Sequence, residues 1–232
     1  MAAKRRQHTG DDAWGIGRSA VFNDVLDTSE VTSSPVSALL SGVLMTLVLA
    51  SSSPRRRELL STLVAQFDIR APEIDETPQH GESPVDYVQR IATQKATEHV
   101  SSEWVNLGAD TTVVLEDQVI GKPSNVDQAR WILGRLSGKT HTVYTAVALA
   151  QSAGVDTLLS ATKVTLTQLS QSAIDAYLLS DEPWDKAGAY GIQGYAGAFV
   201  ERIEGSYSGV VGLPLCETRM LLHENGIELK HG

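Results

Sequence analysis

After its first 45 residues, the chain shows apolar and polar positions that follow alternately the period of a strand and the period of a helix. Residues 46–50 are mostly apolar and are predicted to form a buried strand. A helix is predicted to begin at Ser53-Pro54, because serine is a frequent N-cap and proline suits the first helical position. Residues 83–100 are predicted to form an amphipathic helix in which Lys95 falls among apolar positions. This alternation predicts an α/β fold rather than a helical bundle or a β-sandwich.

The same two periods continue through the rest of the chain. Ser124 and Asp127 form a predicted capping box, after which apolar residues recur at helical spacing as far as Leu136. Residues 186–197 hold too many glycines for a regular element and are predicted to form a loop shaped for close approach. The other predicted elements are a hairpin over 107–120, strands over 139–150 and 160–169, and a helix over 172–179.

The first 44 residues show no clear periodicity, and Met45 stands directly before the first predicted strand. We therefore expect one folded domain over 45–232. The preceding extension, 1–44, is predicted to be a flexible tail or the product of a start codon assigned too early. The apolar run at 36–50 is too short to span a bilayer, so no membrane partner is expected.

Composition narrows the functional classes. The chain has 232 residues, of which 42% are hydrophobic, and a formal net charge of −9. An acidic protein is a poor candidate for binding a nucleic-acid duplex, because such binding requires many exposed Lys and Arg side chains. Cys216 is the single cysteine, so a reducing compartment and a cytoplasmic location are expected, with Cys216 as a small buried hydrophobe.

A basic cluster marks the start of the first predicted helix. Arg55, Arg56 and Arg57 lie in its first turn, where cations oppose the positive end of the helix macrodipole. A bound phosphate would remove this conflict, because a helix N-terminus and arginine side chains both donate hydrogen bonds to its oxygens. Helical spacing directs Arg55 and Arg56 to one side and Arg57 elsewhere. The alternative is an ordinary solvated basic turn.

Asp110 lies inside an apolar predicted strand, in the sequence Gly108-Ala-Asp-Thr111. Burial of a carboxylate is costly unless it is paired, bound to metal or catalytic, so the position indicates either chemistry or a structural ion pair. Glu76 adds a second carboxylate, and such hard oxygen ligands favour Mg²⁺ or Mn²⁺ over zinc. Lys95 and Lys122 are the other candidate phosphate ligands.

Three common nucleotide and hydrolase motifs are absent from the sequence. The stretch 134–140 resembles a P-loop but has one residue too few between its glycines and ends a predicted helix. The chain also holds no Gly-x-Ser-x-Gly elbow and no Gly-x-Gly-x-x-Gly after a strand. Acyl hydrolysis and dinucleotide redox chemistry are therefore disfavoured.

Several separated motifs, in this order, resemble those of the Maf family of nucleotide pyrophosphatases. They are Ala50-Ser-Ser-Ser-Pro-Arg-Arg-Arg-Glu-Leu-Leu60, Gly108-Ala-Asp-Thr111, Lys122-Pro123 and Asp185-Lys-Ala-Gly-Ala-Tyr-Gly-Ile-Gln-Gly194. The resemblance implies a mixed, twisted sheet with flanking helices in two lobes around a nucleotide cleft, similar to inosine triphosphate pyrophosphatases. It also implies release of pyrophosphate from a nucleoside triphosphate with a divalent metal cofactor, and it is compatible with a homodimer.

The resemblance also assigns roles to individual residues. Asp110 matches the proton acceptor, and whether it acts as a base or as a metal ligand stays open, while Glu76 matches an acidic position that could hold metal. Arg55, Thr111 and Gln193 match positions that tune substrate choice. The positions that match residues lining the phosphate cleft are Ser51, Arg56, Lys95 and Lys122.

The glycine-rich loop is similar to that of the subfamily that hydrolyses dTTP and UTP. The Gln193 amide can both donate to and accept from the edge of a thymine or uracil ring. Two alternatives stay open. One is a nucleotide-binding regulator of septum formation that acts through a partner, and the other is a pyrophosphatase for methylated guanine or modified pyrimidine nucleotides. Gln193 argues against the guanine version.

Overall fold

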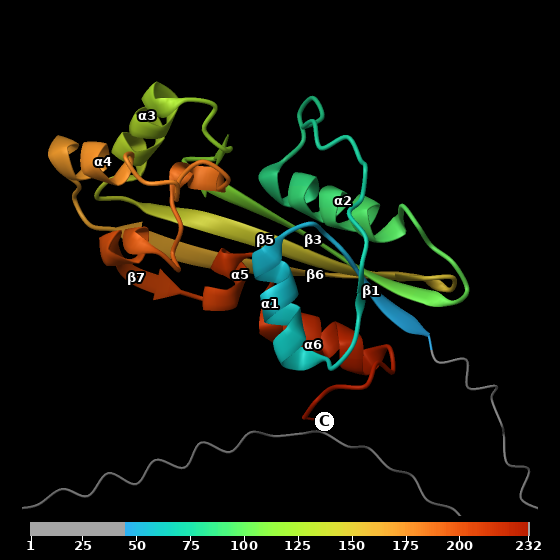
Figure 1. Cartoon of the computed structure of the whole chain (residues 1–232). Helices are drawn as coiled ribbons and strands as arrows, with labels where there is room; N and C mark the ends of the chain where they lie inside the picture. The colour runs from blue at the N-terminus through green and yellow to red at the C-terminus, as the bar shows by residue number, and fades with distance from the viewer. Residues whose placement is uncertain (1–44, 232) are drawn as a thin grey trace, which may run out of the picture. The chain divides into compact units, whose positions relative to one another are not determined.

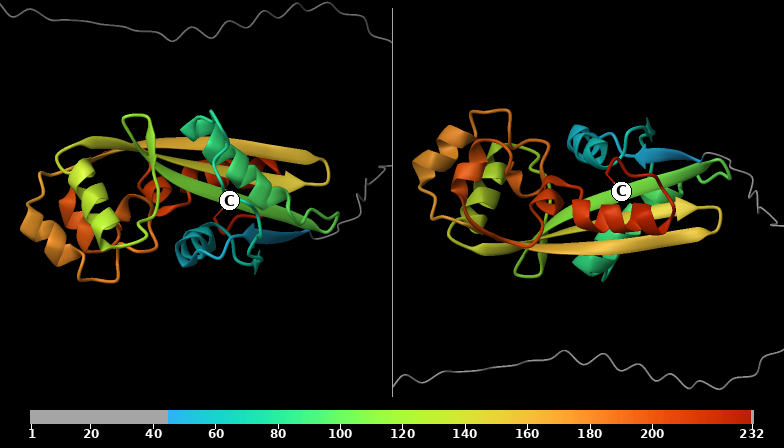
Figure 2. Two further views of the ribbon diagram at one scale, coloured as in Figure 1. Left: turned by 90° about the horizontal axis from the view of Figure 1, so that it is seen from above. Right: turned by 90° about the horizontal axis from the view of Figure 1, so that it is seen from below.

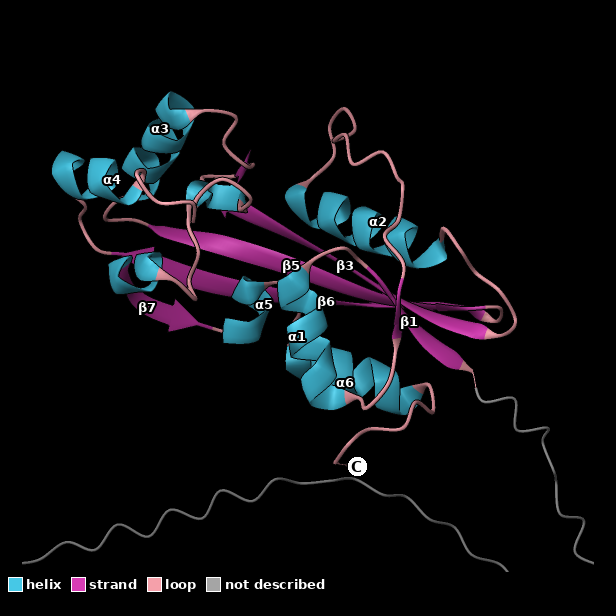
Figure 3. Ribbon diagram, in the orientation of Figure 1, coloured by secondary structure: helices cyan, strands magenta, loops and turns pink. Residues whose placement is uncertain are grey.

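The computed structural model describes residues 45–231, and the predicted extension over 1–44 lies outside them. The strands and helices alternate as predicted, which confirms the α/β class (Figures 1 and 3). The strands are β1 (Thr46–Ala50), β2 (Asp68–Ile69), β3 (Trp104–Leu115), β4 (Gln118–Ile120), β5 (Thr140–Gln151), β6 (Gly154–Leu166) and β7 (Val200–Glu204). The helices are α1 (Pro54–Leu63), α2 (Pro84–Thr97), α3 (Val126–Leu136), α4 (Gln171–Tyr177), α5 (Tyr207–Val211) and α6 (Leu215–Glu224), with 3₁₀ turns at Ala187–Ala189 and Tyr195–Phe199.

The strands form one seven-stranded mixed sheet in the order β2-β1-β3-β5-β6-β7, with β4 paired to β3. β1 runs parallel to β2 and to β3, whereas β3, β5, β6 and β7 are joined by antiparallel pairings. The predicted mixed sheet with flanking helices is therefore confirmed.

One edge of β3 is left open in the middle of the strand. Residues 104–108 of β3 pair with β1, and residues 113–115 pair with β4. Residues 109–112, between these two stretches, have a partner only on the β5 side. This gap lies at the carboxyl end of β1, which is where open α/β sheets commonly bind ligands.

Helices cover both faces of the sheet (Figure 2), and the helices of each face pack into a separate core. α2 packs on one face, where Val88 and Ala92 meet the small side chains of Ala146 and Ala148 in β5. α1 and α6 cover the opposite face, as Figure 2 shows from below, with Leu60 in their shared core.

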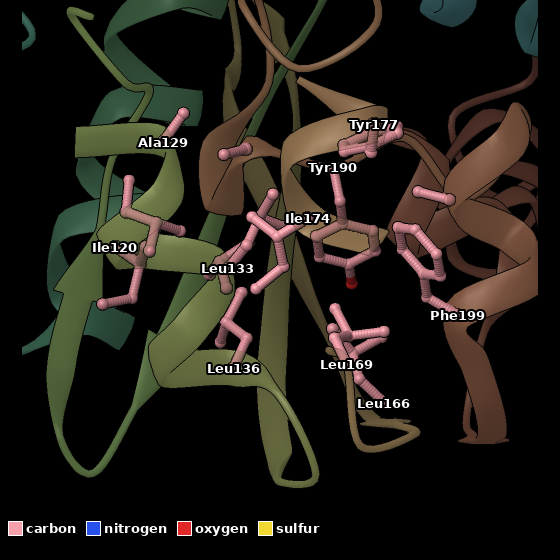
Figure 4. Packing of buried hydrophobic residues seen from close by; sticks show 14 of the residues in the cluster. Ile120, Ala129, Leu133, Leu136, Leu166, Leu169, Ile174, Tyr177, Tyr190 and Phe199 are labelled. Atoms are coloured by element: carbon pink, nitrogen blue, oxygen red, sulfur yellow. The ribbon is translucent and has the colours of Figure 1, made fainter. Parts of the chain in front are cut away.

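A third core lies at the far end of the sheet, under α3 and α4 and the glycine-rich loop (Figure 4). Leu133, Ile174 and Phe199 are among its buried members. The described domain thus has three cores: two on opposite faces of the sheet and a third at its far end. The long strands β3, β5 and β6 join these parts.

Several boundaries differ from the predictions for local reasons. Helix α3 is capped by Asn125, whose side chain accepts the Gln128 backbone N–H, so the predicted capping box at Ser124 is one residue early. Strand β6 begins already at Gly154, because a tight turn leads directly from β5 into it. Cys216 is exposed rather than buried, because α6 turns Thr218 and Leu222 inward. Within residues 45–231, no helix is both long enough and apolar enough to cross a membrane.

Candidate active site

A cleft of about 620 Å³ opens beside the unpaired edge of β3. Its walls come from the β1–α1 junction, from α2 and the loop before it, from the β4–α3 connection and from the glycine-rich loop. Every residue predicted for the site lines this cleft: Ser51, Arg55, Arg56, Glu76, Lys95, Asp110, Thr111, Lys122 and Gln193. Ser51 and Gln193, which are 142 positions apart in the sequence, thus line the same cavity.

Asp110 faces α2, where it forms a buried ion pair with Lys95. Lys95 Nζ lies 2.9 Å from Asp110 Oδ1 and 2.8 Å from Glu76 Oε1. Lys95 and Asp110 are each only 7% exposed, so the pair compensates the cost of burying both charges. The structural ion pair considered as an alternative for Asp110 is therefore present, and it lies in the cleft wall. Asp110 Oδ2 accepts no hydrogen bond from the described residues.

Gly108 allows α2 to approach close enough for this pair. A Cβ atom at Gly108 would lie 2.4 Å from the Ala92 carbonyl oxygen and 2.6 Å from the Ala96 backbone nitrogen. Both of these atoms belong to the backbone of α2, so any larger residue would push the helix away. Glycine in the Gly108-Ala-Asp-Thr motif thus sets the distance between Lys95 and Asp110.

Glu76 approaches Lys95 from the loop before α2, with its side chain 52% exposed. The Tyr87 hydroxyl donates to the Glu76 backbone oxygen at 3.1 Å and fixes this part of the loop. Burial, followed by the negative charges of Asp110 and Glu76, raises the pKa of Tyr87 to about 12. The phenol therefore stays protonated and keeps donating this hydrogen bond.

Thr111 points to the opposite face of the sheet, toward α1. Arg56 Nη2 donates to Thr111 Oγ1 at 3.3 Å, while Nη1 donates to Ser51 Oγ at 3.4 Å and Nε to the Gly212 carbonyl at 2.8 Å. Burial lowers the pKa of Arg56 from its ordinary value, against the attraction of Asp110 and Glu76. An arginine remains charged in such surroundings, so the cleft holds a fixed cation.

Arg55 precedes Arg56 in the first turn of α1 and forms an ion pair with Asp185, a residue for which no role was predicted. Arg55 Nη1 lies 3.0 Å from Asp185 Oδ2, and Lys186 Nζ also bonds to Asp185. Arg57 is exposed and is not among the lining residues, as its helical position predicted. Asp185 and Lys186 both line the cleft, and they belong to the motif Asp185–Gly194 that was noted without a role for them. Their charges carried no distinctive signal, because a loop usually exposes such residues.

Lys122, between β4 and α3, and Gln193, in the glycine-rich loop, are exposed residues that line the cleft. Neither side chain forms a hydrogen bond or an ion pair with another residue of the described range, so both are free to meet a ligand. Tyr190 lies beneath the loop, 5% exposed, with its hydroxyl 2.8 Å from His141 Nε2. This contact fixes Tyr190, which also lines the cleft.

The donor set fits a divalent cation that also uses ligands from a substrate. Glu76 and Asp110 are hard oxygen donors that both contact the Lys95 ammonium, a cation, at less than 3 Å. No group of three or more His, Cys, Asp or Glu residues within 45–231 could enclose a metal. Mg²⁺ commonly binds through one or two carboxylates together with phosphate oxygens and water, which this pair could provide.

Comparison with known proteins identifies the family of this chain. A family model described as Maf-like protein matches residues 46–225. A protein of Shewanella sp. (strain MR-7) named dTTP/UTP pyrophosphatase is 54% identical over 193 residues, which cover 79% of this chain and 100% of that protein. Proteins of the same name from Myxococcus xanthus (strain DK1622) and Hahella chejuensis (strain KCTC 2396) are 51% and 50% identical over 188 residues, which cover 79% of this chain and 94% of each relative. This chain belongs to the family of Maf-like proteins.

Proposed function

We propose that this protein hydrolyses dTTP and UTP to the nucleoside monophosphate and pyrophosphate. The observation that carries the proposal is the placement of Asp110 beside the cations of a cleft that is large enough for a nucleotide. Relatives with about half of their residues identical carry the name dTTP/UTP pyrophosphatase, which supports the same activity here. An acidic chain that concentrates fixed cations in one cleft is suited to a small anionic substrate rather than to a nucleic acid.

The triphosphate binds to the cations that converge on the β1–α1 junction. Arg56 uses three of its five N–H donors on Ser51, Thr111 and Gly212, which leaves two for phosphate oxygens. Ser51 and the N-terminus of α1 contribute further donors to the anion. Arg55 and Lys122 line the same cleft and add two further cations to it.

Asp110 orients or deprotonates the attacking water. Asp110 lines the cleft, and its Oδ2 accepts no hydrogen bond from residues 45–231, while Lys95 holds Oδ1 at 2.9 Å. The carboxylate is therefore fixed in direction and has a free acceptor for a water proton. Positioning and charge neutralisation supply most of the rate in phosphoryl chemistry, and the surrounding cations serve this purpose.

Glu76 and Asp110 are the residues that would hold a divalent cation. When bound, Mg²⁺ or Mn²⁺ neutralises phosphate charge and orients the reacting group. Lys95 contacts both carboxylates and holds them toward the same point of the cleft.

Gln193 reads the base, and Arg55 and Thr111 contribute to substrate choice. Gln193 carries one acceptor and two donors at the exposed end of its side chain, which complements the imide edge of thymine or uracil. The Thr111 hydroxyl accepts from Arg56 at 3.3 Å and lies 3.1 Å from the Thr145 hydroxyl, so its position in the cleft wall is fixed.

We also propose that residues 45–232 form the catalytic domain, that the protein acts in the cytoplasm, and that it forms a homodimer. The family model matches residues 46–225, which supports the domain limit. The cytoplasmic location is supported by the single, exposed Cys216, which suits a reducing compartment. The exposed Trp131 on α3 is a candidate contact for the dimer.

The test is pyrophosphate release from a panel of dTTP, UTP, dCTP, GTP and 7-methyl-GTP with Mg²⁺ or Mn²⁺. Turnover of dTTP and UTP that is lost in Asp110→Asn, and kept in a control Asp117→Asn on the exposed β3–β4 turn, supports the proposal. Turnover mainly of 7-methyl-GTP would assign the methylated-guanine activity instead. Tight nucleotide binding without any turnover would overturn the enzyme and favour the regulator of septum formation.

A further inference from the structure

The turn that carries Gln193 is closed by its own backbone. The Gly194 N–H donates to the Gly191 carbonyl at 3.1 Å, which places Ile192 and Gln193 at the apex of a four-residue turn. Because the Gln193 side chain forms no hydrogen bond to another described residue, its direction depends on how the turn itself is held.

Both ends of this turn lead to one carboxylate, that of Glu182. After the turn, the Tyr195 N–H donates to Glu182 Oε2 at 2.8 Å and the Ala196 N–H donates to Oε1 at 3.2 Å. Before the turn, the Gly191 N–H donates to the Tyr177 hydroxyl at 3.3 Å. That hydroxyl in turn donates to Glu182 Oε1 at 3.0 Å. Charge-assisted bonds of this kind are stronger than neutral ones, so Glu182 is a firm anchor.

Tyr177 is itself fixed in the core beneath the loop (Figure 4). It is 3% exposed, and its ring packs edge-on against Phe199 with the ring centroids 5.4 Å apart. Burial, followed by the charge of Glu182, raises the pKa of the Tyr177 phenol, which therefore stays protonated and donates. The link from Gly191 to Glu182 is thus held by a rigid side chain.

The glycines of the loop provide the space that the carboxylate occupies. A Cβ atom at Gly194 would lie 2.2 Å from Glu182 Oε2, and one at Gly191 would lie 3.0 Å from Oε1. Gly194 has a φ of −103°, which any residue adopts, so space rather than backbone conformation requires glycine there. The loop is therefore built around Glu182.

We propose that Glu182 is a positioning residue that fixes the turn at 191–194, directs the Gln193 amide at the base, and so sets the preference for thymine and uracil over cytosine. This inference rests on the proposed function. Thymine and uracil present a ring N–H between two carbonyls, whereas cytosine presents an amine and a ring acceptor. A fixed amide can match one of these patterns, but a mobile amide can turn to match either.

The first experiment compares pyrophosphate release from dTTP and dCTP by the full chain and by Glu182→Gln. An amide nitrogen cannot accept a hydrogen bond, so at least one of the three donors loses its acceptor. We expect the KM for dTTP to rise about tenfold while kcat stays within about twofold, and the ratio of kcat/KM for dTTP over dCTP to fall about tenfold. Asp181→Asn, the same change of charge at the exposed neighbouring position, should leave all three values unchanged.

An unchanged KM and ratio in Glu182→Gln, with an active parent enzyme, would overturn the positioning role. A parent enzyme that turns over neither dTTP nor UTP would instead overturn the proposed function, so the two failures are distinguishable. A lower thermal midpoint with full discrimination between the bases would show a structural brace only and would also overturn the inference.

A second set of variants tests the contact from the other side. Gly194→Ala places a methyl group where the carboxylate lies, so it should lower the dTTP-to-dCTP ratio as Glu182→Gln does. In Glu182→Ala the space is free, so adding Gly194→Ala should lower the dTTP-to-dCTP ratio little further. Fully additive losses of discrimination in the double variant would refute the contact between Gly194 and Glu182. If the Glu182 variants fail to fold, Tyr177→Phe removes only the hydroxyl link and must shift the ratio in the same direction.

Discussion

Substitution of Gly108 by alanine tests how the fold sets the distance between Lys95 and Asp110. The new Cβ atom would lie 2.4 Å from the Ala92 carbonyl oxygen, whereas ordinary contact begins at 3.4 Å. The Ala92 oxygen belongs to the backbone of α2 and Gly108 belongs to β3, so neither can turn aside as a side chain could. We therefore expect α2 to move away from β3 by about 1 Å, which is the difference between these two distances. The same movement carries Lys95 away from Asp110, and their separation of 2.9 Å leaves little tolerance.

Two measurable effects are expected from this movement. Overpacking of a close interface costs about 1 to 3 kcal/mol, so the free energy of unfolding from urea titration should fall by that amount. A displacement of about 1 Å in an active site can cost on the order of 100-fold in rate, so kcat/KM for dTTP should fall by 10- to 100-fold.

The matched control is Gly134→Ala in the exposed part of α3. A Cβ atom at Gly134 would meet nothing within 4 Å. Alanine in a helix is favoured over glycine by about 1 kcal/mol, so this variant should be more stable than the parent and equally active. A Gly108→Ala protein with the stability and the dTTP turnover of the parent would refute the role of Gly108 as the spacer between α2 and β3.

Three further changes test other contacts. Arg56→Lys should lower kcat/KM for dTTP by about 10- to 100-fold in steady-state assays, because a lysine cannot donate in several fixed directions at once. The control Arg57→Lys should have no effect, and equal effects of the two variants would contradict the assignment of Arg56 to phosphate binding. Lys95→Met should lower the free energy of unfolding by about 3 kcal/mol in urea titration, because it leaves a buried carboxylate unpaired, and an unchanged midpoint would refute this. Burial lowers the pKa of His141 from 6.5 to about 4, so on acidification the unfolded chain binds a proton first and stability is lost between these pH values. His141→Phe should abolish that part of the pH dependence, worth up to about 3 kcal/mol, while substitution of the half-exposed His99 by glutamine should keep it.

Local signals in the sequence predicted most of the elements. Serine before proline indicated the start of α1, and the structure caps this helix with the Ser53 side chain. The strand over 46–50 is confirmed as β1. Boundaries that depend on side-chain competition were less accurate, because Asn125 and Ser124 are both good caps and only the packed helix selects one of them.

The sequence also indicated part of the candidate site, because two of its charged residues stand where apolar residues are expected. Lys95 on an apolar helix face and Asp110 in an apolar strand are each anomalous alone, and buried charges need partners. Their pairing could not be derived from the pattern, because it depends on the approach of α2 that Gly108 permits. Asp185 and Glu182 gave no anomaly at all, since a charged residue in a loop is ordinary until its partners are known.

The position of the site at an open strand edge explains how neighbouring residues serve two different groups. Asp110 and Thr111 are adjacent in β3 and must point to opposite faces of the sheet, one toward Lys95 and the other toward Arg56. A ligand could contact both only where no strand covers the edge between them, and β1 and β4 leave that edge open at residues 109–112. Antiparallel pairing with β5 fixes the register of β3 on the other side, and a slip by one residue would exchange the two faces. The interruption of pairing and the fixed register therefore act together: one admits the ligand, and the other ensures that it meets a carboxylate on one face and a guanidinium on the other.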